Sequence, residues 1–360
     1  MSGKEDTANH AFQSLANQVG GHPGVKTSKN GELVMKPALK AEIEFYQQVR
    51  ANDVLKELRP FVPEFYGTLR LEGQVDHEKS VGGSIVLKEG SADQVKETEK
   101  DSIVLENLSH KFLKPNIMDI KLGTVLFDRN ASEEKRARME KTARETTSFE
   151  TGVRLTGFQV YDIFENIPYN TPKSYGKSIK PSDLPDGIAR FFPVAEDGST
   201  PEPPAGTGLP PELLVPVLEG LRSDITEIRQ ALAEIPLRMV GASLLIAYEA
   251  DWDRSLEAFD YWHSVDTSDD EDEDEEDSDE EERPGQPYVV KLIDFAHTYL
   301  TPGEGPDESV LKGLDTVIKL INGRLEQVRP LLDALRMEED EQDEDDANDE
   351  QDEDDANDES

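Results

Sequence analysis

Cysteine is absent from all 360 residues of the sequence. The chain therefore has no disulfides, no thiolate ligands for a metal and no cysteine nucleophile. Long apolar runs are also missing, and the longest one, residues 239–248, is about half of what spans a bilayer. Residues 1–18 are polar and lack the apolar core of a signal peptide. We therefore expect a soluble intracellular protein in a reducing compartment.

Acidic residues are distributed very unevenly. They fill 13 of the 14 positions of residues 269–282, and 16 more lie in residues 338–360. Without these two runs, 49 carboxylates remain against 38 bases, so the net charge is −11 rather than −40. Runs of like charge without aromatic side chains bury too little apolar surface to offset chain entropy. We expect four flexible or disordered segments: the N-terminus (1–18), a Pro-rich insert (196–211), an acidic loop (266–287) and an acidic tail (337–360).

One acid and one base lie two residues apart in the turn-bounded apolar run 115–123. On an extended strand, residues i and i+2 point to the same face, so Asp119 and Lys121 would project together. A carboxylate and an ammonium group on one face make a plausible site for a phosphate-bearing substrate. On these residues alone, a half-buried strand with a solvated ion pair is the alternative.

A Gly-rich hairpin, residues 20–36, ends in a strand lysine, Lys36. The chain contains neither a GxxxxGK[ST] loop nor a GxGxxG fingerprint, so the hairpin indicates nucleotide binding only weakly. The helix that follows carries Glu42 and Glu44. A strand lysine followed by a helix acid is the order in which kinases orient ATP phosphates. An ordinary exposed lysine beside a helix surface is the alternative.

The apolar strand 103–105 leads into Glu106-Asn107-Leu108. This segment is a candidate hinge, where backbone groups would meet an adenine without needing particular side chains. Further along, the apolar strand 288–295 carries Asp294 near its end, at the position where a kinase would hold Mg²⁺.

A basic helix is predicted over residues 131–144. Ser132 is a good N-cap, and Lys135 and Arg138 are three residues apart and share a face. Five bases on one helix in an acidic chain suit a ligand with several phosphates, although a solvated helix of mixed charge is the alternative. Apolar periodicity predicts helices over residues 213–235 and 309–336 and strands over 153–163 and 239–248.

The order of these segments is kinase-like, but the HRD and APE signatures of protein kinases are missing. The sequence instead resembles the inositol polyphosphate kinase family, whose PxxxDxKxG motif is matched by Pro115, Asp119, Lys121 and Gly123. Further matches follow in the family's order: Gly21-His22, Lys36, Glu44-Phe45-Tyr46, Leu105 to Leu108, Ala131-Ser132-Glu133 with Lys135, Ser243-Leu244-Leu245, and Ile293 to His297. Two departures are Ala242, in place of the first serine of an SSLL motif, and Gln159, where multikinases carry a base. The chain looks most like the fungal inositol polyphosphate multikinases.

The resemblance implies an α+β fold with two kinase-like lobes. An antiparallel β N-lobe with the hinge would comprise residues 19–108, and a mixed α/β C-lobe residues 109–336. A small helical segment that binds the inositol phosphate, residues 131–190, would belong to the C-lobe.

The resemblance also implies ATP and Mg²⁺ as cofactors and a role for each site residue. Lys36, oriented by Glu42 or Glu44, would contact the ATP phosphates, and Glu106 and Leu108 would bind adenine through backbone groups. Asp119 would lie near the ribose and the reaction centre, and Lys121 would touch the transferred phosphoryl and an inositol phosphate. Asp294 with Ser243 would hold Mg²⁺. The inositol phosphate site would be lined by Lys135, Arg138 and His297.

The leading functional hypothesis is an ATP-dependent kinase that converts inositol trisphosphate and tetrakisphosphate towards the pentakisphosphate. An inositol hexakisphosphate kinase and an acidic scaffold for basic nuclear proteins are the alternatives. Phosphoinositide head groups are candidate second substrates. We expect a monomer, in the nucleus and cytoplasm, without direct nucleic acid binding.

Overall fold

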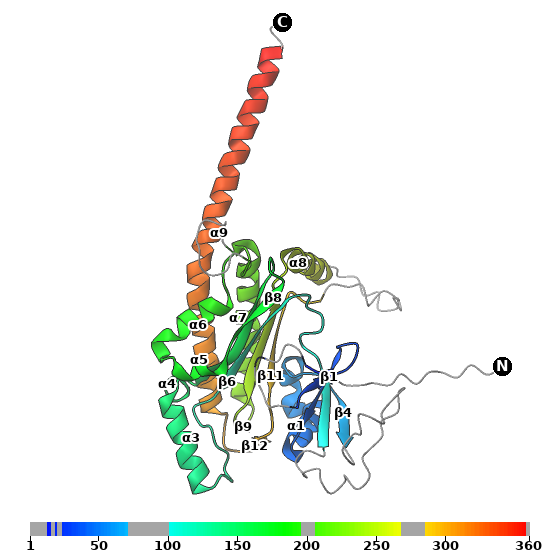
Figure 1. Cartoon of the computed structure of the whole chain (residues 1–360), viewed down its shortest axis with the longest axis vertical. Helices are drawn as coiled ribbons and strands as arrows, with labels where there is room; N and C mark the ends of the chain where they lie inside the picture. The colour runs from blue at the N-terminus through cyan, green and yellow to red at the C-terminus, as the bar shows by residue number, and fades with distance from the viewer. Residues whose placement is uncertain are drawn as a thin grey trace, which may run out of the picture.

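Two lobes, each built on an antiparallel five-stranded sheet, make up the folded chain (Figure 1). The computed structural model describes residues 13–15, 19, 24–70, 101–195, 206–267 and 285–357. The predicted α+β, two-lobed architecture is confirmed. In this part of the chain, no helix combines the length and apolar character that a membrane span requires.

The N-lobe sheet has the strand order β1-β2-β3-β5-β4. Its strands are β1 (Gln13–Ser14), β2 (Lys26–Thr27), β3 (Leu33–Pro37), β4 (Phe65–Arg70) and β5 (Asp101–Glu106). Helix α1 (Lys40–Ala51) packs beside it, and the 3₁₀ helix η1 (Asp53–Phe61) packs against α1. Phe45, Tyr46 and Val49 form the buried face of α1, at the spacing of one helical stripe. The Asn52 side chain caps η1 by accepting a hydrogen bond from the amide of Val54.

The C-lobe sheet has the strand order β11-β10-β6-β7-β8. Its strands are β6 (Pro115–Leu122), β7 (Val153–Asp162), β8 (Ile167–Thr171), β10 (Ser243–Glu249) and β11 (Tyr288–Ile293). The Asp-x-Lys strand is therefore β6, in the centre of the sheet. β9 (Leu237–Met239) and β12 (Thr298–Leu300) form a separate two-stranded ribbon.

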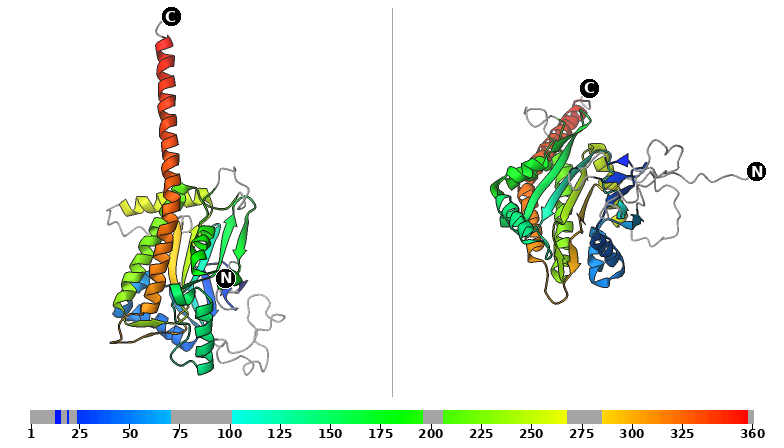
Figure 2. Two further views of the ribbon diagram at one scale, coloured as in Figure 1. Left: turned by 90° about the vertical axis from the view of Figure 1, so that its left-hand side faces the viewer. Right: turned by 60° about the horizontal axis from the view of Figure 1, so that its bottom comes forward.

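Two long helices, α7 (Pro211–Glu234) and α9 (Glu308–Asn357), pack against each other and against the C-lobe sheet (Figures 1 and 2). Their predicted apolar stripes are buried, which confirms both helices. α9 closely approaches the end of α4, just before β7, at two glycines, because a Cβ on Gly313 would lie 2.5 Å from the carbonyl oxygen of Gly152. The other helical elements of the described residues are α3 (Glu133–Glu145), α4 (Ser148–Thr151), α5 (Lys173–Ser178), η3 (Pro181–Asp183), α6 (Leu184–Phe191) and α8 (Trp252–Thr267).

The structure differs from three expectations. Segment 131–190 is only partly helical, because β7 and β8 lie within it and extend the central sheet. The apolar run 239–248 is split into β9 and β10 by a turn at Gly241, whose φ of +79° suits glycine. The acidic tail is helical to Asn357 rather than disordered, since extending an already packed helix requires no new nucleation.

Several expected features lie outside the described residues. These are most of the N-terminus, Gly21-His22 of the first hairpin, residues 196–205 of the Pro-rich insert and residues 268–284 of the acidic loop.

Candidate active site

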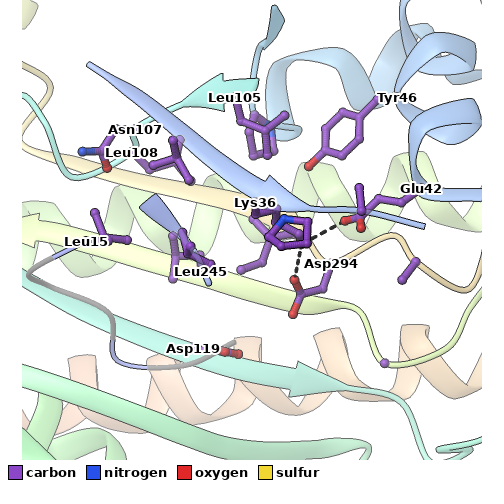
Figure 3. Close-up of a pocket in the computed structure, with 18 of the residues that line it drawn as sticks. Leu15, Lys36, Glu42, Tyr46, Leu105, Asn107, Leu108, Asp119, Leu245 and Asp294 are labelled. Atoms are coloured by element: carbon purple, nitrogen blue, oxygen red, sulfur yellow. Dashed lines mark hydrogen bonds and ion pairs between the residues drawn. The ribbon is translucent and has the colours of Figure 1, made fainter. Parts of the chain in front are cut away.

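A cavity of about 700 Å³ lies between the two lobes (Figure 3). One end is apolar and adjoins the hinge, with Val34, Leu105, Leu108, Ile117 and Leu245 among its walls. The other end is charged, and is lined by Lys36, Glu42, Asp119, Lys121, Asp294 and His297. Such a cavity suits a ligand with a flat apolar base and a highly charged opposite end.

Lys36 connects the lobes at the charged end. Its Nζ lies 2.7 Å from Oδ1 of Asp294 and 2.9 Å from Oε1 of Glu42. Burial lowers the pKa of Lys36, but the charges of Asp294 and Glu42 outweigh burial, so the pKa is raised and the amine stays charged. Glu44 is not its partner, because this carboxylate is half-exposed and pairs with Lys40 one turn earlier on α1.

We expect Glu42→Gln to lower kcat/KM for ATP by about tenfold or more, because Lys36 loses a charged partner that fixes its ammonium group. Glu44→Gln is the matched control and should leave kcat/KM within about twofold of the wild type. Steady-state kinetics with varied ATP compare the two variants. Equal losses in both variants would contradict this assignment of the helix acid.

Asp119 is fully buried on β6, yet it lines the cavity. Burial raises the pKa of this carboxyl, and the charge of Asp294 adds to the effect, whereas Lys121 and a hydrogen bond from Ser243 oppose it. Within the described structure, Oδ1 of Asp119 has no hydrogen-bond partner. A buried acceptor without a partner is costly, so this oxygen is available to a ligand in the cavity.

Lys121 shares the face of Asp119, as the strand alternation predicts. Its Nζ donates to the carbonyl of Gly241 (2.8 Å) and to Oγ of Ser243 (3.1 Å), and lies 3.5 Å from Oδ2 of Asp294. Ser243 is opposite Lys121 in the β6-β10 register. The ammonium group is thereby held at the centre of the charged end. The Gly241 carbonyl was not predicted, since a backbone acceptor leaves no side-chain signal.

Asp294 follows β11 and lies between two ammonium groups, those of Lys36 and Lys121. Its φ of +68° is in the left-handed region, which is uncommon for a residue other than glycine. Backbone strain of this kind is concentrated at functional sites, where the surrounding structure enforces it. The strained backbone directs one carboxylate to both lysines.

The donor set at this position is compatible with Mg²⁺. Among the described residues, no group of three or more histidine or acidic side chains forms a metal site. Mg²⁺ in phosphoryl-transfer enzymes needs only one or two carboxylates, because water and substrate phosphates complete its shell. Asp294 supplies such a carboxylate. Ser243 is opposite Ile293 in the register between β10 and β11, and Ile293 directly precedes Asp294.

Asp128 organises the basic residues at the far side of the site. Its Oδ2 lies 3.6 Å from Nζ of Lys135 on α3 and 3.4 Å from Nδ1 of His297. Burial raises the pKa of Asp128, but a hydrogen bond from the Asn130 amide and the charges of His297 and Lys135 outweigh burial, so the pKa is lowered. Asp128 was not predicted, because its two partners are far apart in sequence. Arg138 is exposed on α3, one turn after Lys135.

The described geometry has a recognisable sequence counterpart. A family profile with the description "Inositol polyphosphate kinase" matches residues 102–322. The chain belongs to this family. It is an inositol polyphosphate kinase, and the expected resemblance is confirmed.

Relatives of two kinds are similar to the chain. The inositol polyphosphate multikinase of Saccharomyces cerevisiae is 32% identical over 366 residues, which cover 88% of this chain and 99% of the relative. Mouse inositol hexakisphosphate kinase 3 is 29% identical over 228 residues, 61% of this chain and 50% of the relative. A crystal structure of the S. cerevisiae inositol phosphate multikinase Ipk2 with ADP and Mn²⁺ has a TM-score of 0.56 and 25% identity. The match covers 82% of this chain and 100% of the crystallised chain.

Proposed function

We propose that this inositol polyphosphate kinase is a multikinase that transfers the γ-phosphoryl group of ATP to inositol trisphosphate and tetrakisphosphate, towards the pentakisphosphate. The observation that carries the proposal is the cavity, where Lys36 and Lys121 converge on Asp294 beside an apolar, hinge-lined compartment. The similarity to the yeast multikinase over nearly both whole chains supports this acceptor class. The similarity to a hexakisphosphate kinase covers only half of that relative.

On the nucleotide side, the base would occupy the apolar compartment against the backbone of Glu106 and Leu108. Lys36 would bind the phosphates, and Asp119 would face the ribose with its free oxygen. Mg²⁺, held by Asp294 and Ser243, would neutralise phosphate charge when bound. Phosphoryl transfer depends mostly on positioning and on electrostatic stabilisation, and the rigid lysines at this end of the cavity provide both.

On the acceptor side, Lys121 would meet the transferred phosphoryl group and a phosphate of the inositol ring. His297, Lys135 and Arg138 would bind the other ring phosphates. Asp128 keeps Lys135 and His297 close together in the absence of ligand. Because this carboxylate contacts both side chains, we expect it to preorganise them for a ligand.

The acceptor panel is the experiment that tests the proposal. Purified protein with ATP and Mg²⁺ should phosphorylate inositol trisphosphate and tetrakisphosphate, and pentakisphosphate should accumulate in chromatograms of the products. Turnover of hexakisphosphate should be at least about tenfold slower in kcat/KM, as expected when a site contacts a specific set of substrate groups. Conversion of hexakisphosphate without conversion of trisphosphate would instead establish a hexakisphosphate kinase.

A further inference from the structure

The Tyr46 hydroxyl on α1 has no hydrogen-bond partner within the described structure, although its side chain is only 1% exposed. Tyr46 also lines the cavity between the lobes. Figure 3 shows its hydroxyl directed towards the space between Leu105 and Lys36. A buried hydroxyl without a partner costs stability, so its presence beside an open cavity points to a ligand that completes it.

The hydroxyl is held in a fixed position. The Tyr46 ring stacks on Phe65, with centroids 5.5 Å apart, and meets the edge or face of Phe295 at 5.3 Å. Two aromatic neighbours from different lobes leave the ring little freedom to rotate away. The oxygen is therefore preorganised for one partner at one place.

The hydroxyl is also a reliable hydrogen-bond donor. Burial raises the pKa of Tyr46 well above its ordinary value, and the charges of Glu42, Asp294 and Glu106 raise it further. The proton consequently stays on the oxygen at neutral pH.

We propose that the Tyr46 hydroxyl donates a hydrogen bond to N7 of the bound purine, directly or through one water, and so selects the nucleotide. This inference rests on the proposed binding of the base at Glu106 and Leu108. A purine that uses N1 and its 6-amino group at the hinge and N9 for the ribose presents N7 as its remaining acceptor on the amino side. Leu105 directly precedes the hinge. The N7 edge of the purine would therefore face the space towards which the Tyr46 hydroxyl is directed.

The test compares ADP with 7-deaza-ADP, in which a C–H group replaces N7. Calorimetry on the wild-type protein should show about five- to tenfold weaker binding of 7-deaza-ADP, the size expected for one hydrogen bond. Tyr46→Phe keeps both ring contacts and should bind the two nucleotides equally, at the weaker affinity. In turnover assays KM for ATP should rise while kcat stays constant, because the contact exists before the transition state as well.

Tyr248→Phe is the matched control, since the Tyr248 hydroxyl is also buried but donates to the carbonyl of Phe191 at 2.6 Å. This variant should lower Tm and keep the wild-type ratio between the two nucleotides. Tyr46→Phe without nucleotide should have an unchanged or higher Tm, because an unpaired hydroxyl is removed. A lower Tm for Tyr46→Phe, or an ADP to 7-deaza-ADP ratio like the wild type, would overturn the proposal. Binding of ADP requires no acceptor, so failure of the proposed function would appear separately, as absent phosphoryl transfer by the wild type.

Discussion

Lys121→Met is expected to lower kcat by about 10² to 10⁴, the range observed when a charged group at a phosphoryl-transfer centre is lost. The Lys121 ammonium is fixed by Gly241, Ser243 and Asp294 without ligand, so it reaches the reaction without further ordering. Its proposed position between the donor phosphoryl and the acceptor phosphate reduces repulsion between two anions as they approach. Methionine keeps most of the apolar stem and removes only the charge.

The effect should appear in kcat with a smaller change in KM for ATP, and rapid-quench single-turnover assays would measure the chemical step. Lys40→Met is the matched control, because Lys40 is 87% exposed and pairs only with Glu44 among its described contacts. It should retain wild-type turnover. Near-normal kcat in the Lys121 variant would contradict the assignment of the reaction to this end of the cavity.

Asp294→Asn is expected to lower kcat by about 10³, because the carboxylate that orients both lysines and would hold Mg²⁺ is lost. Asparagine is chosen because it tolerates the left-handed backbone that Asp294 adopts, so the turn after β11 should persist. Asp294→Ala should lose an additional ~1 kcal/mol of folding stability through backbone strain. Chemical denaturation of the two variants would separate the strain from the loss of charge.

Calorimetry with ADP provides a second readout for Asp294→Asn. With Mg²⁺ the variant should bind ADP more weakly than the wild type does. Without divalent metal the order should reverse, because the wild-type carboxylate repels the phosphates and occupies Lys36 and Lys121. If adding Mg²⁺ changed the ADP affinity of the variant as much as that of the wild type, Asp294 would be excluded as the carboxylate that holds the metal.

Much of the fold could be predicted because its elements have local signals. The two-residue alternation of β6 correctly placed Asp119 and Lys121 on one face, and Ser132 caps α3 through the amide of Lys135 as expected. Helix α8 was missed, since its sixteen residues mix apolar and charged side chains and lead into the acidic run. The helical tail was also missed, because composition predicts disorder while continuity with a packed helix favours helix.

The site was less predictable where it depends on long-range contacts. Sequence spacing left Glu42 and Glu44 as equal candidates, and only the folded position of α1 shows which one faces Lys36. Asp128 and the carbonyl of Gly241 depend on segments that are distant in sequence. The unpaired state of Tyr46 is visible only when all surrounding groups are in place.

The length of α9 has an electrostatic consequence for a polyanionic substrate. The helix leaves the C-lobe at the end opposite α3 and continues well beyond the body of the protein (Figures 1 and 2). At 1.5 Å per residue, positions 337–357 extend over roughly 30 Å, about four times the Debye length of about 8 Å in physiological salt. Most of the tail's negative charge is therefore screened from the basic surface around Lys135 and His297. The 16 acidic residues of positions 338–360 can therefore add to the net charge of the chain without weakening the basic surface that a molecule with several phosphates would meet.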